Sequence, residues 1–323
     1  MRLRVWLTGA VFIAAGVQAF AQGASYPSKP VTIIVPGVAG GGLDTTARIL
    51  AEGLRKHFNQ TFLVENRPGA ATALGATVVY RAPPDGYMLL QSPNSPLTFL
   101  PVTKKSLPYE ATKLTPIAIT GIQPFVMTVK PQFAGNDFAS FLAHARANPG
   151  KLNYASPGIG SANHLATLMF QKVTGTDMVH VPFSGGTQAI QEMLRGDIDF
   201  YMLPQDGVYE LYRSGKLKIF AVGTPERSKD LPEVPTFREL GLPNEVRLTV
   251  LYALLGPPGM PADVAAKLNE GVNAVFKMPD VIERYRQLRI EPTGGKAETL
   301  RDLILSELAV WGKVAKDNAI EVD

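Results

Sequence analysis

Short apolar runs alternate with helical patterns along most of the chain. The run 31–35, Val-Thr-Ile-Ile-Val, is apolar and β-branched, as expected for a buried strand. After a group of glycines, apolar residues recur every three or four positions as far as Phe58, which predicts one face of a helix. Strand, Gly/Ser-rich loop and helix follow one another three times, with the loops near 36–44, 156–164 and 182–190. This alternation predicts a mostly parallel α/β sheet, in which ligands bind beyond the carboxyl ends of the strands.

The same patterns place the other elements. Further strands are expected at 62–65, 87–90, 116–119, 125–129, 153–155, 179–181, 198–203, 217–222 and 251–255. Further helices are expected at 71–80, 138–147, from 162, from 187, and at 208–213, 262–277, 279–289 and 297–318. The stretch 92–106 is rich in Pro and Ser, which predicts a loop.

The loop 36–44 joins the first predicted strand to the first predicted helix. It offers free backbone N–H groups at the positive end of that helix, where an anion can bind. No Lys-Ser/Thr follows Gly42, and the glycines do not match Gly-x-Gly-x-x-Gly, so a nucleotide phosphate is not supported. A small carboxylate fits these N–H groups. The alternative is a tight turn whose glycines only permit close packing.

Composition narrows the class of protein. The 323 residues allow two domains, and 46% hydrophobic against 19% charged residues predict a packed globular core. The sequence has 32 basic and 28 acidic residues. Arg2 and Arg4 lie in a segment expected to be removed, so the mature chain would have 32 − 2 = 30 basic residues against 28 acidic ones. This near-neutral balance gives no support for nucleic-acid binding. The absence of cysteine excludes disulfides, thiolate zinc sites, iron–sulfur clusters and a cysteine nucleophile.

The N-terminus has the pattern of a secretory signal peptide. A basic start at 1–4 precedes the mostly apolar stretch 5–20, and Ala19-Phe20-Ala21 is a small-x-small cleavage site before Gln22. An uncleaved anchor helix is the alternative. No later stretch is apolar for long enough to span a bilayer, so export as a soluble protein is expected.

Signatures of catalysis are missing from the sequence. It has no Gly-x-Ser-x-Gly, Ser-x-x-Lys or His-Glu-x-x-His motif. The four histidines lack metal-ligand spacing, and His57 and His144 are expected at the surface. Ser184 beside His180 would be a conceivable dyad, but no acid partner is evident. We therefore expect no enzyme, no metal and no cofactor.

Ten short motifs follow one another along nearly the whole mature chain. They are the 36–44 loop, 64–70 (Val-Glu-Asn-Arg-Pro-Gly-Ala), 85–87 (Asp-Gly-Tyr), 107–109 (Leu-Pro-Tyr), 154–161 (Tyr-Ala-Ser-Pro-Gly-Ile-Gly-Ser) with 164–166 (His-Leu-Ala), 180–183 (His-Val-Pro-Phe), 215–217 (Gly-Lys-Leu), 227–228 (Arg-Ser), 234–236 (Val-Pro-Thr) and 256–261 (Gly-Pro-Pro-Gly-Met-Pro). Each motif is weak alone. In this order they resemble the Bug family, the periplasmic solute-binding receptors of tripartite tricarboxylate transporters.

The resemblance implies a two-domain periplasmic binding protein of type II topology. Each domain would be a five-stranded α/β sheet, with a ligand in the cleft between them. After the signal peptide, 1–21, domain 1 would comprise 22–122 and 251–323, and domain 2 would comprise 123–250. The chain would cross between the domains near Gln123 and Val250.

The implied function is that of a monomeric periplasmic receptor. It would capture a small carboxylate, a di- or tricarboxylate or an aromatic acid, by hinge closure. It would then deliver the ligand to the membrane subunits of a tripartite tricarboxylate-type transporter. The alternatives are a ligand-sensing binding protein that feeds a signalling system and a receptor for an ATP-driven importer.

The resemblance also implies which residues bind the ligand. Those of the first domain are Val38, Ala39, Gly40 and Gly41, with Asp44 shaping their loop, and Ser95 on another cleft loop. Those of the second domain are Ser156, Gly160, Ser161, His164, Phe183, Ser184 and Gly185. Two of these have structural alternatives, because Ser161 would also serve as a plain N-cap and His164 as a half-buried histidine with its hydrogen bonds satisfied.

Three positions depart from the family pattern, and a fourth bears on one of them. Gly37 stands where an aromatic residue is usual, and Leu100 where Asn is common. Leu203 replaces an acid that can bind an amino or hydroxyl group, which favours a carboxylate with an apolar or aromatic body over an amino acid. Asp206 would either take over from that acid or lie on the surface, and surface is the favoured interpretation.

Overall fold

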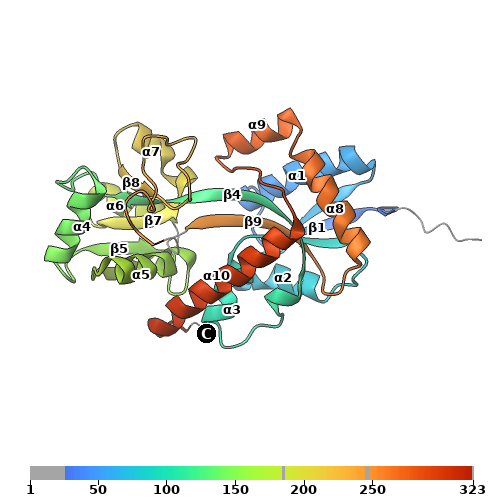
Figure 1. The fold of residues 1–323 in the computed structure, drawn as a ribbon, viewed down its shortest axis with the longest axis horizontal. Helices are drawn as coiled ribbons and strands as arrows, with labels where there is room; N and C mark the ends of the chain where they lie inside the picture. Colours follow the sequence, from blue (N-terminus) through green and yellow to red (C-terminus); the bar gives the residue numbers. More distant parts are fainter. Residues whose placement is uncertain (1–25, 184–185, 244–247, 322–323) are drawn as a thin grey trace, which may run out of the picture.

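The computed structural model describes residues 26–183, 186–243 and 248–321. The predicted signal peptide therefore lies outside the described residues. Two lobes are joined by two long strands that run between them (Figure 1). Among the described residues, no helix is both long and apolar enough to cross a membrane.

One mixed sheet runs through both lobes in the order β2-β1-β3-β9-β4-β7-β5-β6, and β8 also pairs with β4. Its strands are β1 (Val31–Val35), β2 (Phe62–Asn66), β3 (Met88–Ser92), β4 (Thr115–Val129), β5 (Asn153–Ser156), β6 (Val179–Pro182), β7 (Phe200–Pro204), β8 (Lys218–Val222) and β9 (Thr249–Gly256). Within each lobe the strands that precede the Gly/Ser-rich loops are parallel to their neighbours. Strand β4 is antiparallel to β7, β8 and β9, so the prediction of a mostly parallel sheet is wrong at its centre.

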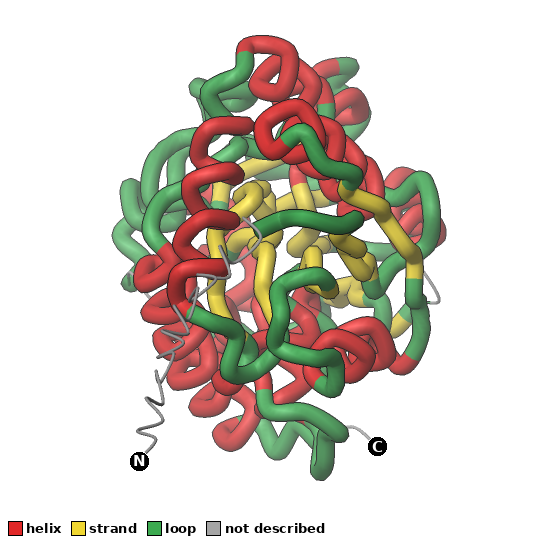
Figure 2. The backbone as a smooth tube through the Cα atoms, turned by 90° about the vertical axis from the view of Figure 1, so that its right-hand side faces the viewer, coloured by secondary structure: helices red, strands yellow, loops and turns green. Residues whose placement is uncertain are grey.

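Helices cover both faces of the sheet (Figure 2). The longer helices are α1 (Gly42–Phe58), α2 (Ala73–Tyr80), α4 (Phe138–Ala147), α5 (Ala162–Thr174), α6 (Gly186–Arg195), α8 (Ala262–Val275), α9 (Pro279–Gln287) and α10 (Ala297–Asp317). The short helices are α3 (Leu100–Thr103) and α7 (Tyr209–Arg213), with η1 (Ala70–Thr72), η2 (Ser95–Phe99), η3 (Ala111–Lys113) and η4 (Gln205–Gly207). We call the part that contains β1–β3, α1, α2, α8 and α9 the first lobe, and the part that contains β5–β8 and α4–α7 the second lobe (Figure 1).

Each lobe has an apolar layer on both faces of its part of the sheet. In β1, Ile33 packs into the layer beneath α1 and α8, whereas Ile34 packs into the layer beneath α2 and α10. In β7 of the second lobe, Phe200 packs on the side covered by α4 and α5, whereas Tyr201 packs on the side covered by α6. Successive side chains of a strand point to opposite faces, so these runs are apolar throughout because both faces are buried.

Strand β4 is one continuous strand, not the two strands predicted at 116–119 and 125–129. It pairs with β9 along residues 115–124 and with β7 along residues 125–129, and the register shifts twice before Gly121. Pro116 lies at the first of these shifts and Gly121 at the second, as is usual for Pro and Gly within a strand.

The stretch 92–106 was expected to be a loop, and this prediction is wrong. It contains a π-helical turn, η2, followed directly by α3. Pro96 and Pro101 lie in the first turns of these elements, where a missing N–H is tolerated. Phe99 is buried against Trp311 of α10, with ring centroids 5.1 Å apart.

Helix α10 lies along both lobes. Leu300 and Ile304 pack in the first lobe, whereas Trp311 and Val314 join the apolar layer of α4 and α5. Near its end, Asp317 forms an ion pair with Lys172 of α5. The last helix therefore connects the lobes along a face remote from α9 (Figure 1).

Candidate ligand-binding site

The first predicted site loop is held by a buried carboxylate. Asp44 accepts hydrogen bonds from the Gly40 N–H (2.9 Å), Asn66 Nδ2 (3.0 Å) and Arg48 Nε (3.0 Å). Burial acts to raise the pKa of Asp44, but the Arg48 side chain and the two hydrogen bonds from Gly40 and Asn66 hold it below its usual value. Asn66 also donates to the Gly37 carbonyl, so β2 fixes the loop from the side.

Donor groups remain free in this loop. Helix α1 starts after Gly41, which has no side chain to cap it. The N–H of Gly40 is bound to Asp44, and that of Gly41 makes a long bond to the Val38 carbonyl (3.4 Å). Among the described residues, nothing accepts a hydrogen bond from the N–H groups of Val38, Ala39 or the first α1 residue, Gly42. Exposed Val38 and Ala39 therefore present free donors beside the positive end of a helix.

Four of the predicted second-lobe residues lie together at the ends of β5 and β6. Ser161 is the N-cap of α5: its hydroxyl accepts from the His164 N–H (3.3 Å) and donates to the Gly158 carbonyl (2.7 Å). The N–H of Gly160 donates to Nδ1 of His164 (3.2 Å). Buried Ser156 forms a hydrogen bond with His180 Nε2 at 2.6 Å.

The two histidines of this cluster are stacked and neutral. Their ring centroids are 4.2 Å apart, and Tyr154 stacks on His180 at 5.0 Å. Burial first, and then the neighbouring His180, lower the pKa of His164 to about 4. Burial also lowers the pKa of His180. Because Nδ1 of His164 accepts a hydrogen bond, its proton is on Nε2, and at neutral pH this ring offers a donor without a charge.

The other predicted site residues are placed as follows. Ser95 is half-buried at the start of η2, and its hydroxyl donates to the Ala71 carbonyl (3.0 Å). The N–H of half-buried Phe183 donates to the Ser156 carbonyl (2.8 Å), which fixes the turn after β6. Ser184 and Gly185 lie outside the described residues. The imagined Ser184–His180 dyad therefore has no structural description, and His180 instead binds Ser156.

Sequence analysis missed a polar group at the junction of the lobes. Gln123 of β4 is 2% exposed and Tyr252 of β9 is 7% exposed, and the Tyr252 hydroxyl lies 3.4 Å from Gln123 Oε1. Leu203 is buried in the second-lobe core, but Asp206 on η4 is exposed. The available signal was a glutamine in a stretch whose other polar residues are threonines, since a buried amide side chain is uncommon without a reason.

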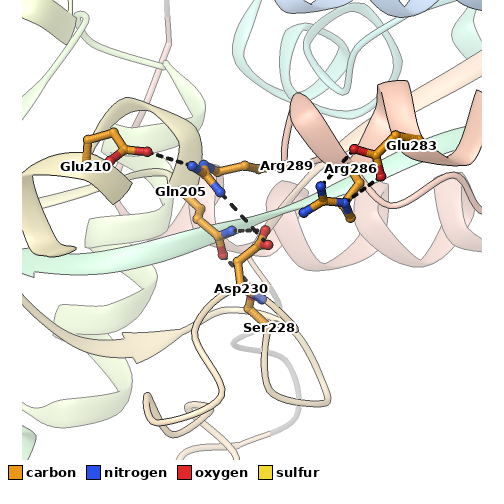
Figure 3. Close-up of polar contacts among 7 residues, drawn as sticks. All are labelled: Gln205, Glu210, Ser228, Asp230, Glu283, Arg286 and Arg289. Atoms are coloured by element: carbon orange, nitrogen blue, oxygen red, sulfur yellow. Dashed lines mark hydrogen bonds and ion pairs between the residues drawn. The ribbon is translucent and has the colours of Figure 1, made fainter.

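An arginine from the first lobe reaches the second. Arg289, just after α9, pairs with Glu210 of α7 at 2.7 Å (Figure 3). Its guanidinium also lies over the ring of Tyr209, 3.4 Å from the ring centroid. Asp230 is 4.0 Å from the same guanidinium and accepts a hydrogen bond from Gln205. Lys229 and Glu291 form a second ion pair across the same boundary at 2.7 Å.

Two features lie away from these groups. A pocket of about 300 Å³ lies between Pro101, Tyr109 and Leu308, and contains none of the predicted site residues. In the part of the chain that the structure describes, no group of three or more His, Asp or Glu side chains is placed to hold a metal ion.

Comparison with known proteins assigns the family. The model of the tripartite tricarboxylate transporter family receptor matches residues 46–320. The chain belongs to this receptor family. BugT of Bordetella pertussis is 30% identical over 315 residues, which are 97% of this chain and 96% of BugT. The resemblance to the Bug family is thus confirmed.

Solved structures agree with this assignment. The structure of MatC from Rhodopseudomonas palustris with bound malate is 30% identical, has a TM-score of 0.73, and covers 90% of this chain and 99% of its own. Rpa4515 of the same organism, with adipate, is 27% identical with a TM-score of 0.77, over 92% and 99%. The predicted two-domain binding-protein fold is confirmed. The ligand-site residues and the domain boundaries stay predictions.

Proposed function

We propose that this protein is a periplasmic receptor that captures a small carboxylate between its lobes and delivers it to the membrane subunits of a tripartite tricarboxylate-type transporter. One observation carries the ligand class: the N–H groups of residues 38–39 and of the first residue of α1 are free, and all lie in or next to a loop fixed by Asp44. Backbone donors at a helix start favour a carboxylate without an accompanying lysine. Malate and adipate in the two related structures are also carboxylates.

The second lobe would hold the other end of the ligand. In this proposal, the Nε2–H of His164 and the residue Phe183 face the ligand, and Ser161 and Ser156 hold the two loops in place. Ser184 and Gly185 remain predicted ligand-binding residues. The uncharged Nε2–H of His164 can donate a hydrogen bond to the far end of a ligand whose first carboxylate is bound by the N–H groups of the first loop. A di- or tricarboxylate fits this pair of donor groups better than an acid with an apolar body.

Closure would follow from a hinge in the two connecting strands. Gln123 and Val250, the proposed crossing points between domains 22–122 with 251–323 and 123–250, are direct partners in the β4–β9 register. Bending both strands at one level lets the lobes move as rigid bodies. The contacts of Arg289 and Lys229 across the boundary would form on closure and stabilise the bound state.

The remaining parts of the proposal come from the family and the sequence. We place the mature chain, from Gln22, in the periplasm as a monomer without enzymatic activity. A receptor needs only binding and a change of shape that membrane subunits can recognise.

A thermal-shift screen tests the ligand class. The mature protein would be heated with succinate, malate, adipate, citrate and benzoate, and with the matching amides as controls. A ligand at about a hundred times its dissociation constant adds about 2.7 kcal/mol to the free energy of unfolding. We expect a raised melting temperature with at least one carboxylate and none with its amide. Stabilisation by amides alone, or by no carboxylate, would contradict the proposal.

A further inference from the structure

A side-chain amide links the connecting strand β9 to the middle of α10. Asn94, which follows β3, is 5% exposed. Its Oδ1 accepts a hydrogen bond from the Leu251 N–H (2.6 Å), and its Nδ2 donates to the Glu307 carboxylate (3.1 Å). The hydroxyl of buried Thr98 donates to the same carboxylate oxygen (2.9 Å). Hydrogen bonds to a carboxylate are roughly twice as strong as those between neutral groups, so these two donors hold Glu307 firmly.

The link meets β9 at the level of the proposed hinge. Strand β3 pairs with β9 as far as Ala253. Beyond this point the Asn94 side chain accepts from the N–H of Leu251, two residues before Ala253. Leu251 is the neighbour of Val250, the proposed crossing point between the domains. The part of β9 that would bend on closure is therefore attached, through one amide, to a helix outside the sheet.

Glu307 separates two halves of α10 that have different partners. Leu300 and Ile304, before it, pack in the first lobe, whereas Trp311 and Val314, after it, pack in the apolar layer of α4 and α5. Figure 1 shows α10 lying along both lobes. A helix that packs on two moving bodies either slides against one of them or turns about a point that both share.

The position of the link suits it for such a point. Atoms near an axis of rotation move least, so the hydrogen bonds of Asn94 to Leu251 and to Glu307 can persist in the open and the closed form. We propose that Asn94 and Glu307 form a pivot that fixes α10 to the hinge and confines closure to a rotation about one axis. Glu307 is then a positioning residue, which acts on the ligand site through the arrangement of the lobes. This inference rests on the hinge closure of the proposed function and adds residues that control it.

Distances between two spin labels test the pivot without a ligand. The sequence has no cysteine, so cysteines introduced at exposed Ala266 of α8 and Ala143 of α4 would carry one label in each lobe. Pulsed electron paramagnetic resonance of the free protein gives the distribution of distances between the labels. We expect Glu307→Ala to broaden this distribution about twofold, because α10 can then slide along β9. Glu307→Gln keeps an oxygen that accepts both hydrogen bonds and should leave the width unchanged.

Two further variants separate a pivot from a contribution to stability alone. Asp302→Ala removes an exposed acid of the same helix, which pairs with the adjacent Arg301, and should leave the distances unchanged. Thr98→Val removes one of the two donors to Glu307 and should broaden the distribution less than Glu307→Ala does, so it remains a test if the alanine variant does not fold. A role in stability alone would lower the urea midpoint of Glu307→Ala and leave the width of the distribution unchanged.

Affinity for malate provides a second readout. Calorimetry should show a fall of about two- to thirtyfold in Glu307→Ala, the range for residues that act on a site through a conformational equilibrium, and no change in Glu307→Gln. An unchanged distance distribution in both Glu307→Ala and Thr98→Val, or tighter malate binding by Glu307→Ala, would overturn the pivot and leave the carboxylate receptor standing. Failure of every carboxylate to bind the wild-type protein would overturn the proposed function, and the distances in the free protein would still decide whether the pivot exists.

Discussion

The contacts of Arg289 make the strongest prediction about closure. Replacement by alanine removes the cation–π contact with Tyr209 and the ion pair with Glu210. A cation–π contact contributes about 0.5–2 kcal/mol. Because the Glu210 side chain is 79% exposed, its ion pair adds only about 0.2–1 kcal/mol. The closed form should therefore lose about 1–3 kcal/mol. If the open form predominates without ligand, affinity should fall by a factor of about 5 to 150.

The matched control for this variant is Arg286→Ala. Arg286 precedes Arg289 by three residues, and its guanidinium pairs with Glu283 of the same helix (Figure 3). Both variants remove one positive charge from the end of α9, but of the two arginines it is Arg289 that has an ion pair and a ring contact with the second lobe. Calorimetric titration with malate should show weaker binding for Arg289→Ala and an affinity within twofold of wild type for Arg286→Ala.

Salt provides a second readout. At about 1 M salt the Debye length is about 3 Å, so the ion-pair part of the difference between the two variants should shrink while the ring contact remains. Small-angle scattering should show that Arg289→Ala is less compact than wild type at the same malate concentration. Equal affinity in the two variants, or tighter binding by Arg289→Ala, would refute the role of Arg289 in closure.

Three further predictions concern the two loops. Gly40→Asp and Ser161→Asp should abolish carboxylate binding because each adds a negative charge beside the ligand. The uncharged variants Gly40→Asn and Ser161→Asn should still bind. Affinities unchanged in both Asp variants, measured by calorimetry, would contradict the site. Asp44→Ala should lower the free energy of unfolding, measured with urea, by about 2–4 kcal/mol, because the loop donors lose their acceptor. A loss of less than about 0.5 kcal/mol would show that Asp44 does not hold the loop. His164 has its pKa lowered to about 4, so the unfolded chain takes up its proton first as the pH falls. The free energy of unfolding should therefore have its full value above pH 6.5. It should fall by up to about 3 kcal/mol as the pH is lowered towards 4. His164→Asn should flatten this dependence of the free energy of unfolding on pH, whereas the control His144→Asn, at an exposed position, should not. An unchanged slope in His164→Asn would show that other groups cause the acid sensitivity.

Local patterns were enough to predict most elements. The limits of α4, 138–147, agree with the sequence prediction at both ends, and α10 differs by one residue. Both helices have a regular apolar face. Strand β4 was divided in two because Gly121 and Pro124 usually end strands, and only pairing with β9 on one side and β7 on the other keeps it continuous.

The residues of the candidate site also fall into those that the sequence could predict and those that it could not. Asp44 and Ser161 are local features, because a helix start fixes both their neighbours and their hydrogen bonds. Gln123 and Tyr252 are brought together only by the pairing of β4 with β9. Sequence patterns contain no information on which strands are neighbours, so this group could not be predicted, and the same holds for Arg289 and Glu210.

The most direct test of the account is a crystal structure of the mature protein with the carboxylate that stabilises it most. We predict a closed molecule with one ligand carboxylate on the free N–H groups of Val38, Ala39 and Gly42, and the opposite end on the second-lobe loops around His164. Density in the separate pocket near Tyr109 and Leu308, with the loop 38–42 empty, would contradict the central claim that these two loops bind the ligand.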